Sequence, residues 1–544
     1  MLEKNKHFTA EITDITSEGQ GVCKVDGMAV FVPLTAVGDV IEGKIVKPHK
    51  SYAYGICERI VSMSPDRVEN ECPVYKKCGG CDFRHISYDA ECRTKALIVE
   101  NAFRRIAGLN PVFEQFITAD TECRYRNKAQ YPIAMVDGKA VCGFYAPRSH
   151  RLIPTMDCAL QPEIFKEILE VVLDYINGRR LSVYSEETNT GIIRHIYIRR
   201  GSYSGEIMVC IVARKDISRR LVPLWKILSE HFAEIKSFVM NINPDSTNVI
   251  LGEKCITIGG NDTITDTMCG NKIEISPLSF YQINTIQAEK LYAKALDYAS
   301  PNENDIIADL YCGAGTIGLS MAHKTQKIVG IEIVSDAIEN ARKNALNNNI
   351  SNTEFYCGDA GNVFSELHKN GCNPDIIVID PPRKGCSQDS LDVIIAALPK
   401  KIVMISCNPA TAARDAKYLS DNGYTVEKVC GVDLFPRTKH VETIVLLSKL
   451  KSTHHIEVEL KTDGLDLTFS ESKATYDEIK AYVKEHAGLT VSSLNIAQLK
   501  QKYGIIEREN YNKAKSKNSR QPKCPKEKED AIVEALRYFK VTVK

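Results

Sequence analysis

The chain has 544 residues, 44% of them hydrophobic and 26% charged, and its formal net charge is +1. This length and composition predict a soluble protein of three or four domains. The near-zero net charge excludes a strong electrostatic field of one sign, so any nucleic acid must be bound by local basic patches.

The N-terminal sequence MLEKNKHFTAEITD lacks the long apolar core of a signal peptide, and no later segment is apolar for long enough to span a bilayer. We therefore expect a cytoplasmic protein with no membrane partner. In that compartment the nineteen cysteines are not expected to form a disulfide framework. Clustered cysteines favour metal binding or catalysis, whereas isolated ones such as Cys210 are expected in the core.

Residues 1–60 alternate apolar and polar side chains between Gly and Pro turns, and VDGM at 25–28 is typical of a hairpin turn. The pattern predicts a small OB-like β-barrel of the kind that binds nucleic acids. A barrel that only packs against its neighbour is the alternative.

A cluster of cysteines follows. The sequence ECPVYKKCGGCDF places Cys72, Cys78 and Cys81 at a C-x5-C-x2-C spacing. The fourth thiol of a metal site must come from elsewhere in the chain. Cys158 in PTMDCALQ is the first candidate, and Cys92 is its rival. Four thiolates bind zinc or an iron–sulfur cluster, and the spacing alone does not separate these two.

The pattern of predicted strands and helices in the next segments indicates two domains. Residues 61–265 form a β-rich central domain around the cysteine site, with a helical pattern in AECRTKALIVENAFRRIAG and a hairpin in RHIYIRRGSYSGEIMVCIVAR. Residues 266–450 alternate strands with helices, which predicts an α/β domain with a Rossmann-like parallel sheet.

The first strand of this sheet, in IIADLYCGAGTIGLSMA, leads into Gly313, Gly315 and Gly318. This G-x-G-x-x-G pattern lets the backbone approach a ligand closely. The next two strands end at Glu332 and before Asp359, which we expect beside ribose hydroxyls and an adenine. A dinucleotide is the rival ligand, and either acid taken alone is equally well explained as a surface residue.

The fourth strand ends in the sequence Asp380-Pro-Pro. The two prolines stiffen the loop and remove backbone donors, so the carboxylate is aimed at a ligand or a substrate. Dinucleotide dehydrogenases have no particular use for this device, whereas S-adenosyl-L-methionine-dependent methyltransferases do. The sequence therefore favours S-adenosyl-L-methionine as the cofactor.

The fifth strand ends at Cys407, where Asn408-Pro409 turns the chain. A single cysteine is more often structural, but its place beside the predicted cofactor pocket favours a nucleophile. Carbon 5 of a pyrimidine becomes reactive toward a methyl donor when a thiolate adds to carbon 6. A base must then remove the proton from carbon 5, and Glu442 in RTKHVETIVLLSK is the candidate. An exposed acid at the start of a strand is the alternative interpretation of Glu442.

Residues 451–544 form a helical C-terminal extension by prediction, with two short amphipathic helices, the basic stretch NKAKSKNSRQPKCPKEKE and a last helix. Basic residues gain affinity for RNA from counterion release. A solvated appendage with no binding role is an equally good interpretation.

Five segments, in this order and spacing, carry a resemblance to a known family: SFYQIN, DLYCGAGTIGL, VIDPPRKG, SCNPAT and HVET. Over roughly its first 450 residues the chain resembles the bacterial 23S ribosomal RNA (uracil-C5)-methyltransferases, a branch of the class I S-adenosylmethionine-dependent RNA m5U methyltransferases. The resemblance implies methylation of carbon 5 of a specific uridine in 23S rRNA, in a loop or bulge from which the base is flipped out. It does not say which uridine, or how many.

The same resemblance implies roles for individual residues. Cys407 is the nucleophile that bonds to carbon 6, and Glu442 is the proton-abstracting base. The implied contacts of the methyl donor are Gln282, Tyr311, Glu332 and Asp380, beside the turn at Gly313.

The resemblance further implies that the N-terminal barrel is a TRAM module in contact with RNA, and that Arg126 and Lys128 in YRNKAQYP lie near the RNA. It also selects a [4Fe–4S] cluster, held by Cys72, Cys78, Cys81 and Cys158, to which we assign a structural role. We expect the protein to be a monomer.

Two other functions are alternatives to this one. An RNA cytosine-C5 methyltransferase usually has a second cysteine after a proline in the fourth-strand motif, where this chain has DPPR. An iron–sulfur RNA-binding protein with an inert methyltransferase fold would not need an intact Cys407, Glu442 and donor pocket.

Overall fold

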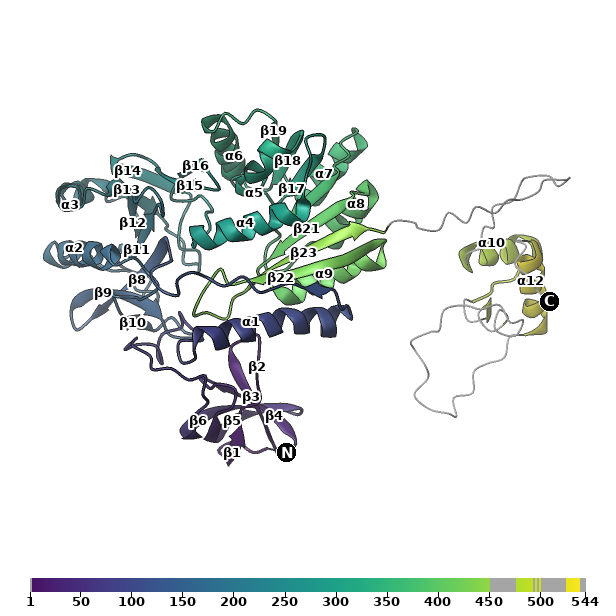
Figure 1. The fold of residues 1–544 in the computed structure, drawn as a ribbon, viewed down its shortest axis with the longest axis horizontal. Coiled ribbons are helices and arrows are strands. Elements are labelled where there is room, and N and C mark those ends of the chain that lie inside the picture. Colours follow the sequence, from purple (N-terminus) through teal and green to yellow (C-terminus); the bar gives the residue numbers. More distant parts are fainter. Residues whose placement is uncertain (1, 451–475, 493–494, 497–498, 500–524, 539–544) are drawn as a thin grey trace. The chain divides into compact units, whose positions relative to one another are not determined.

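The computed structural model describes residues 2–450, 476–492, 495, 496, 499 and 525–538. The chain divides into two compact units, Met1–Ser452 and Thr453–Lys544. The described residues of the first unit form three large sheets, one two-stranded hairpin and their helices, coloured from purple to green in Figure 1. Within the described residues, no helix has the length and apolar character needed to cross a membrane.

The N-terminal sheet has six strands in the order β1-β5-β6-β4-β3-β2. Their bounds are β1 His7–Glu11, β2 Asp14–Ile15, β3 Gln20–Val25, β4 Met28–Pro33, β5 Val40–Pro48 and β6 Tyr52–Ser62. Only Ile12 and Thr13 separate β1 from β2, so the two edge strands are continuous in the chain and the sheet curls into a barrel. The predicted hairpin turn is present, because Asp26 and Gly27 both have positive φ, 49° and 77°, as a type I′ turn requires.

The central sheet has seven strands in the order β10-β9-β8-β11-β12-β13-β14. Their bounds are β8 Lys128–Val136, β9 Lys139–Tyr145, β10 Leu152–Pro154, β11 Ile193–Arg200, β12 Ile207–Ala213, β13 Ile235–Ile242 and β14 Lys254–Gly260. Strands β11 and β12 form the predicted hairpin. Two helices, α2 (Ile164–Gly178) and α3 (Ser218–His231), share one apolar core with this sheet. A short hairpin, β15 (Ile264–Met268) and β16 (Asn271–Ile275), leads to the third sheet.

The third sheet has eight strands in the order β19-β18-β17-β20-β21-β23-β22-β7. Their bounds are β7 Val112–Phe113, β17 Ile306–Leu310, β18 Lys327–Glu332, β19 Thr353–Cys357, β20 Ile376–Ile379, β21 Lys401–Ser406, β22 Tyr424–Val432 and β23 Glu442–Lys449. The strands from β19 to β21 run parallel, and β23 is antiparallel to β21. This is the doubly wound arrangement that the alternating strand and helix pattern predicts.

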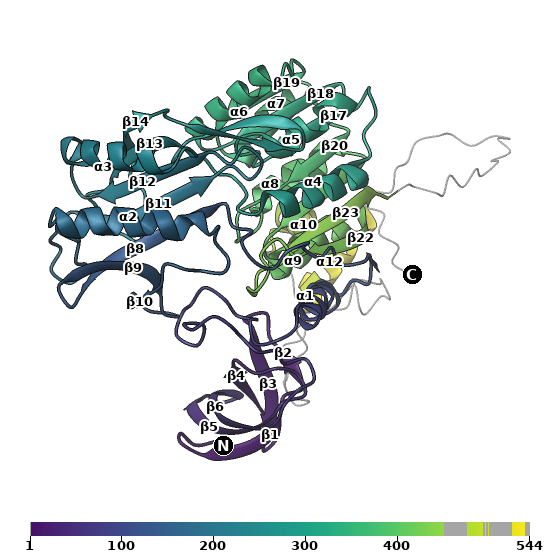
Figure 2. The same ribbon diagram turned by 60° about the vertical axis from the view of Figure 1, so that its left-hand side comes forward.

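Helices cover both faces of the third sheet (Figure 2). They are α4 Thr285–Ala299, α5 Thr316–Met321, α6 Ser335–Asn347, α7 Ala360–Lys369, α8 Gln388–Ala397 and α9 Pro409–Asp421. Successive strand residues enter different cores: Ile377 and Ile379 of β20 pack with α7, α8 and α9, whereas Ile376 and Val378 pack with α4 and α5. Because both faces are buried, the strands are almost wholly apolar.

The predicted helix at residues 90–108 is present as α1 (Tyr88–Ala102), continued by one π turn at Phe103–Ala107. Although it falls within the predicted central domain, α1 lies against the third sheet, and β7 then joins the edge of that sheet beside β22 (Figure 1). Val99 and Phe103 belong to the same apolar core as α9 and β22, and their burial explains why the chain returns to this sheet.

The second unit contains α10 (Tyr476–Ala487) and α12 (Lys526–Tyr538). Ile479 and Val483 of α10 share a small core with Ile532 and Leu536 of α12. The first predicted amphipathic helix of this extension is α10, and Gly488 follows it with φ of 67°. Most of the basic stretch, residues 512–524, lies outside the described residues.

Candidate active site

A cavity of about 910 Å³ opens at the carboxyl ends of the parallel strands of the third sheet. Each strand contributes a polar group at its last residue or within the next two residues. The cavity is lined by all the residues that the sequence assigns to catalysis and to the methyl donor: Gln282, Tyr311, Gly313, Glu332, Asp359, Asp380, Cys407 and Glu442.

The glycine turn after β17 is built for close approach of a ligand. Gly313 and Gly315 have positive φ, 54° and 79°, and a Cβ on Gly313 would meet nothing within 4 Å. The buried Asp309 fixes the turn from below, because its Oδ2 accepts a hydrogen bond of 2.9 Å from the amide of Gly318. A Cβ on Gly318 would lie 2.9 Å from Ile328, so the helix after the turn can pack against β18 only with glycine at this position.

Glu332 is the last residue of β18, and its carboxylate accepts hydrogen bonds from the glycine turn and from the loop after β18. Its Oε2 accepts from the Gly313 amide at 3.2 Å, and its Oε1 accepts from the Val334 amide at 3.0 Å. Asp359 caps the N-terminus of α7 by accepting from the amide of Asn362 at 3.1 Å. Both carboxylates therefore have fixed positions on the cavity wall, where they can accept hydrogen bonds from a ligand.

Asp380 directly follows β20, and its amide donates to the carbonyl of Leu310 at 3.3 Å. Its carboxyl faces the cavity but is otherwise enclosed by protein, and this loss of solvent raises its pKa to about 7. A cation in the cavity would favour the charged form. The site is therefore suited to a ligand with a positive charge, such as a sulfonium.

Cys407 directly follows β21, and Glu442 is the first residue of β23. The two strands are antiparallel, with Ser406 paired to Thr443, so the thiol and the carboxyl stand at the same end of neighbouring strands. Burial, together with the negative charge of Glu442, raises the pKa of Cys407, while Arg383 lowers it in part. Burial, together with Asp380, raises the pKa of Glu442 to about 8.

The turn after Cys407 has a clear structural reason. Asn408 caps α9 by accepting a hydrogen bond of 3.1 Å from the amide of Ala410, and Pro409 occupies the first turn of the helix. The strand ends at Ser406, just before Cys407, because a helix begins at Pro409. The thiol is consequently held at the lip of the cavity, half-buried, with Cys407 between two rigid elements.

Four residues of the cavity were missed by the sequence analysis as functional candidates: Phe280, Arg383, Phe435 and His440. Three of them lie within the quoted motifs SFYQIN, VIDPPRKG and HVET, which was the available signal. Phe280 is 63% exposed and lines the cavity. Burial lowers the pKa of His440 to about 4, so this imidazole is neutral at physiological pH.

A second, smaller cavity of about 70 Å³ is lined by the four predicted metal ligands Cys72, Cys78, Cys81 and Cys158. The rival ligand Cys92 is buried in α1 and does not line it. Among the described residues, no group of three His, Cys, Asp or Glu side chains is arranged to hold a single metal ion. A zinc ion requires four sulfurs about 2.3 Å from one point, and the described thiols are not arranged in that way.

Two arginine side chains line the same cavity as the four thiols, and their positive charges would favour the thiolate forms. Arg84 donates from Nε to the sulfur of Cys81 at 3.4 Å. A terminal nitrogen of Arg84 and Nε of Arg126 are buried without a hydrogen-bond partner in the structure. Buried donors of this kind are normally satisfied, and a cluster carrying thiolates and sulfides would supply the missing negative charge. The donor set therefore fits an iron–sulfur cluster.

Comparisons with known proteins decide the family. A family model described as tRNA (Uracil-5-)-methyltransferase matches residues 271–450. Proteins described as RNA methyltransferases in Clostridium tetani and Listeria monocytogenes are 39% and 41% identical to this chain over 447 residues, which is 82% of this chain and 97% and 98% of theirs. The chain belongs to the S-adenosylmethionine-dependent RNA (uracil-5-)-methyltransferases.

A solved structure of the same kind supports the fold. The tRNA (uracil-54, C5)-methyltransferase of Pyrococcus abyssi, in complex with S-adenosyl-L-homocysteine, is 25% identical to this chain with a TM-score of 0.65. The match covers 81% of this chain and 99% of that one. The predicted Rossmann-like fold is thereby confirmed, and so is the resemblance to RNA m5U methyltransferases. The enzyme transfers a methyl group from S-adenosyl-L-methionine to RNA.

Proposed function

We propose that this enzyme methylates carbon 5 of a specific uridine in 23S ribosomal RNA through a transient bond between Cys407 and carbon 6 of the base. The observation that carries the proposal is the placement of a thiol and a carboxyl, Cys407 and Glu442, at adjoining strand ends in the cavity that also contains the donor residues. A methyltransferase acting on a more nucleophilic atom would need neither group.

The chain's own residues account for each step. Cys407, as a thiolate whose proton has been released to solvent, adds to carbon 6 and places the electron pair on the carbonyl oxygen at carbon 4. Carbon 5 then bonds to the methyl group of S-adenosyl-L-methionine, whose sulfur keeps the electron pair of the broken bond and leaves as S-adenosyl-L-homocysteine. The Glu442 carboxylate takes the hydrogen of carbon 5 as a proton. The bond between sulfur and carbon 6 then breaks, and its electron pair returns to Cys407.

The proposed binding site of the methyl donor is formed by residues at the carboxyl ends of the parallel strands. Glu332 accepts hydrogen bonds from the ribose hydroxyls, and Asp359 lies beside the adenine. Asp380 offsets the positive charge of the sulfonium, while Gln282 and Tyr311 complete the contacts along with the open turn at Gly313. Gln282 is held in place through its own carbonyl, which accepts from Asn127 at 2.8 Å.

RNA is proposed to reach the cavity across the N-terminal barrel, as expected of a TRAM module. Four ring-bearing residues cluster on β4, on β6 and on the turn between β5 and β6: Phe31, His49, Tyr52 and Tyr54. Lys47 and Arg148 line a surface hollow with the last three of them. Aromatic rings stack on unpaired bases and basic side chains contact phosphates, so this surface suits a single-stranded loop or bulge of rRNA.

We further propose that Cys72, Cys78, Cys81 and Cys158 hold a [4Fe–4S] cluster. Its support is the joint lining of one cavity by four thiols and two partly unpaired guanidinium groups. No step of the methyl transfer requires electron transfer, so the role assigned to the cluster is structural. The protein is expected to act in the cytoplasm as a monomer.

A second substrate deserves a direct comparison, because the matching family model and the Pyrococcus abyssi protein are both described in terms of tRNA. The purified protein should be incubated with methyl-labelled donor and unmodified transcripts of 23S rRNA or tRNA. Labelled 5-methyluridine in rRNA is expected. Label in tRNA alone would contradict the 23S assignment, 5-methylcytidine would favour the cytosine-C5 alternative, and no transfer to any RNA would favour an inert RNA-binding protein.

A further inference from the structure

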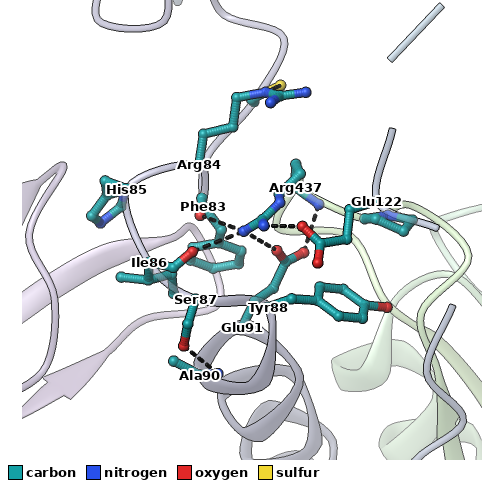
Figure 3. Close-up of polar contacts among 12 residues, drawn as sticks. Phe83, Arg84, His85, Ile86, Ser87, Tyr88, Ala90, Glu91, Glu122 and Arg437 are labelled. Atoms are coloured by element: carbon teal, nitrogen blue, oxygen red, sulfur yellow. Dashed lines mark hydrogen bonds and ion pairs between the residues drawn. The ribbon is translucent and has the colours of Figure 1, made fainter. Parts of the chain in front are cut away.

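The loop between β22 and β23, residues 433–441, brings Phe435 and His440 to the cavity and ends at Glu442. It has no regular secondary structure, so its shape must be fixed by contacts with other segments. These contacts come mostly from α1 and from residues 72–86, here called the cysteine segment because it contains Cys72, Cys78 and Cys81. Figure 3 shows the contacts centred on Arg437.

Four consecutive carbonyls of the β22–β23 loop accept hydrogen bonds from distant parts of the chain. The pairs, acceptor first, are Leu434 with Asn284 at 3.1 Å, Phe435 with Lys95 at 3.2 Å, Pro436 with Tyr125 at 2.9 Å, and Arg437 with the amides of Asp82 and Phe83 at 2.9 and 3.2 Å. The loop is therefore held at every residue from 434 to 437.

Arg437 makes the largest share of these contacts. Its backbone amide donates to Glu91 at 2.7 Å, and its guanidinium donates to the carbonyl of Ile86 at 2.8 Å and pairs with Glu122 (Figure 3). The side chain is 11% exposed. Its φ of 69° lies in the left-handed region, which a non-glycine residue occupies only when its surroundings hold it there.

A buried group of charges supports the same loop from α1. Lys95 donates from Nζ to Asp433 at 2.8 Å and to Glu91 at 2.7 Å, and all three side chains are fully buried. Glu91 thus links Lys95 to the amide of Arg437. Removing one member of such a group leaves a charge buried and unpaired, which costs several kcal/mol, so the loop has a single favoured position on α1.

The cysteine segment clamps the loop on the other side. Asp82, the neighbour of Cys81 in the chain, donates from its amide to the carbonyl of Arg437 and accepts at Oδ2 from the amide of Lys439 at 2.9 Å. The carbonyl of Asp82 in turn accepts from the hydroxyl of Tyr75 at 2.7 Å. Three chain positions separate the clamp at Lys439 from Glu442.

We propose that Arg437 is a positioning residue for methyl transfer. It locks the β22–β23 loop onto α1 and the cysteine segment, and so fixes Glu442 and His440 at the wall of the cavity. Through Asp82 the same contacts make the position of Glu442 depend on the order of the segment around Cys81. This inference rests on the proposed role of Glu442 as the base, and it adds what holds that base in place.

The test uses the full-length protein and two substitutions at one position. Arg437→Gly removes the guanidinium but suits the positive φ, so backbone strain cannot explain its effect. Arg437→Lys keeps the charge but not the planar fork of donors. Arg194→Gln is the matched control, because Arg194 is also buried and donates to a backbone carbonyl, that of Asn243 at 3.0 Å, in the central sheet.

Three quantities are measured: kcat for methyl transfer to RNA, the Kd of S-adenosyl-L-homocysteine, and amide hydrogen exchange of residues 433–441. For Arg437→Gly we expect kcat to fall about 100-fold, the loss typical of a misplaced catalytic group. The Kd should stay within about twofold of wild type, because the donor residues lie on other strands. Exchange of residues 433–441 should increase, Arg437→Lys should recover part of kcat, and Arg194→Gln should change neither kcat nor this exchange.

Three results would overturn the inference. They are a kcat of Arg437→Gly close to wild type, unchanged exchange in the β22–β23 loop, or an equal loss of kcat in Arg194→Gln. Failure of the proposed function is a different result, since the wild-type protein would then not methylate RNA or would form no covalent intermediate. The exchange measurement tests the role of Arg437 in either case.

Discussion

Cys407 and Glu442 lie at adjoining ends of the antiparallel strands β21 and β23, one residue beyond the pairing of Ser406 with Thr443. The fold therefore places the proposed nucleophile and the proposed base on one wall of the cavity, while most of the residues proposed to contact the donor lie at the ends of β17, β18, β19 and β20. A uracil bound between these two sets of residues would present carbon 6 to the thiol. Its carbon 5 would face the methyl group of the donor and the Glu442 carboxylate.

Glu442→Gln should trap the reaction after methyl transfer. An amide cannot take the proton from carbon 5, so the bond between Cys407 and carbon 6 cannot be broken by elimination. We expect turnover to fall by a factor of about 100 or more. A covalent complex of the enzyme with its methylated RNA, formed from RNA without fluorouracil, should accumulate and survive denaturing electrophoresis. Rapid turnover without such a complex would contradict the assignment of Glu442.

Methyl transfer should increase with pH. Both reactive groups have raised pKa values, Glu442 at about 8 and Cys407 above its ordinary value, and each acts in its deprotonated form. Below pH 8 the carboxyl is mostly protonated and the thiol is neutral. We therefore expect kcat/KM to rise from pH 6 to a plateau above the pKa of these groups. A rate that falls over this range would contradict the account.

Asp380→Asn should stabilise the free enzyme and abolish donor binding. A carboxyl whose pKa is raised to about 7 in the folded state destabilises the fold increasingly as the pH rises above the unfolded value. Removing its charge should raise the free energy of unfolding on the order of 2 kcal/mol at pH 8, and less at pH 5. Calorimetry with and without S-adenosyl-L-homocysteine measures both effects.

Asp375→Asn is the matched control on the same sheet. Lys400 and the amide of Ile306 hold the pKa of Asp375 below its ordinary value, so this charge contributes stability above that value and its removal should destabilise the fold at pH 8. Equal changes of the same sign in the free energy of unfolding of both variants would show that the burial of the Asp380 carboxyl does not destabilise the fold.

Cys158→Ser should remove iron and sulfide from the purified protein. The fourth thiol of the cavity is needed to complete a [4Fe–4S] cluster, whereas Cys92 lies outside the cavity, so Cys92→Ser should keep the full content. Chemical iron and sulfide analysis together with the visible absorption spectrum checks both variants. Loss of iron from Cys92→Ser but not from Cys158→Ser would reverse the ligand assignment.

Much of the third sheet could be predicted from the sequence, because its signals are local. A strand buried on both faces gives a continuous apolar run, and the group that follows it lies at the sheet's carboxyl edge. Asp380 and Cys407 could be placed beside each other on this basis alone. The turn at Asp26-Gly27 was equally predictable, since it depends on two residues only.

Helices α2 and α3 of the central domain were not predicted. The apolar residues of α2, among them Phe165, Ile168, Leu169 and Val172, recur at helical spacing, but they include a run of branched residues that also suits a strand. The return of α1 and β7 to the third sheet could not be foreseen, because the partners of Val99 lie more than 300 residues away in the sequence.

The support of the active site was also beyond prediction. Arg437 is one basic residue among the 70 of the chain, and nothing nearby in the sequence indicates that Glu91 and Glu122 meet it. Contacts of this kind depend on how separate segments pack. The candidate site could therefore be located from motifs, whereas the way its base is held could be seen only in the structure.

Covalent capture with RNA that carries 5-fluorouracil tests the central claim most directly. Fluorine replaces the proton that Glu442 must remove, so the adduct cannot be released after methyl transfer. The account predicts a stable complex of one protein and one RNA, with the nucleotide attached to Cys407 in peptide mass spectra, and no complex with Cys407→Ala. Normal methylation of ordinary RNA by Cys407→Ala, or attachment at another residue, would contradict it.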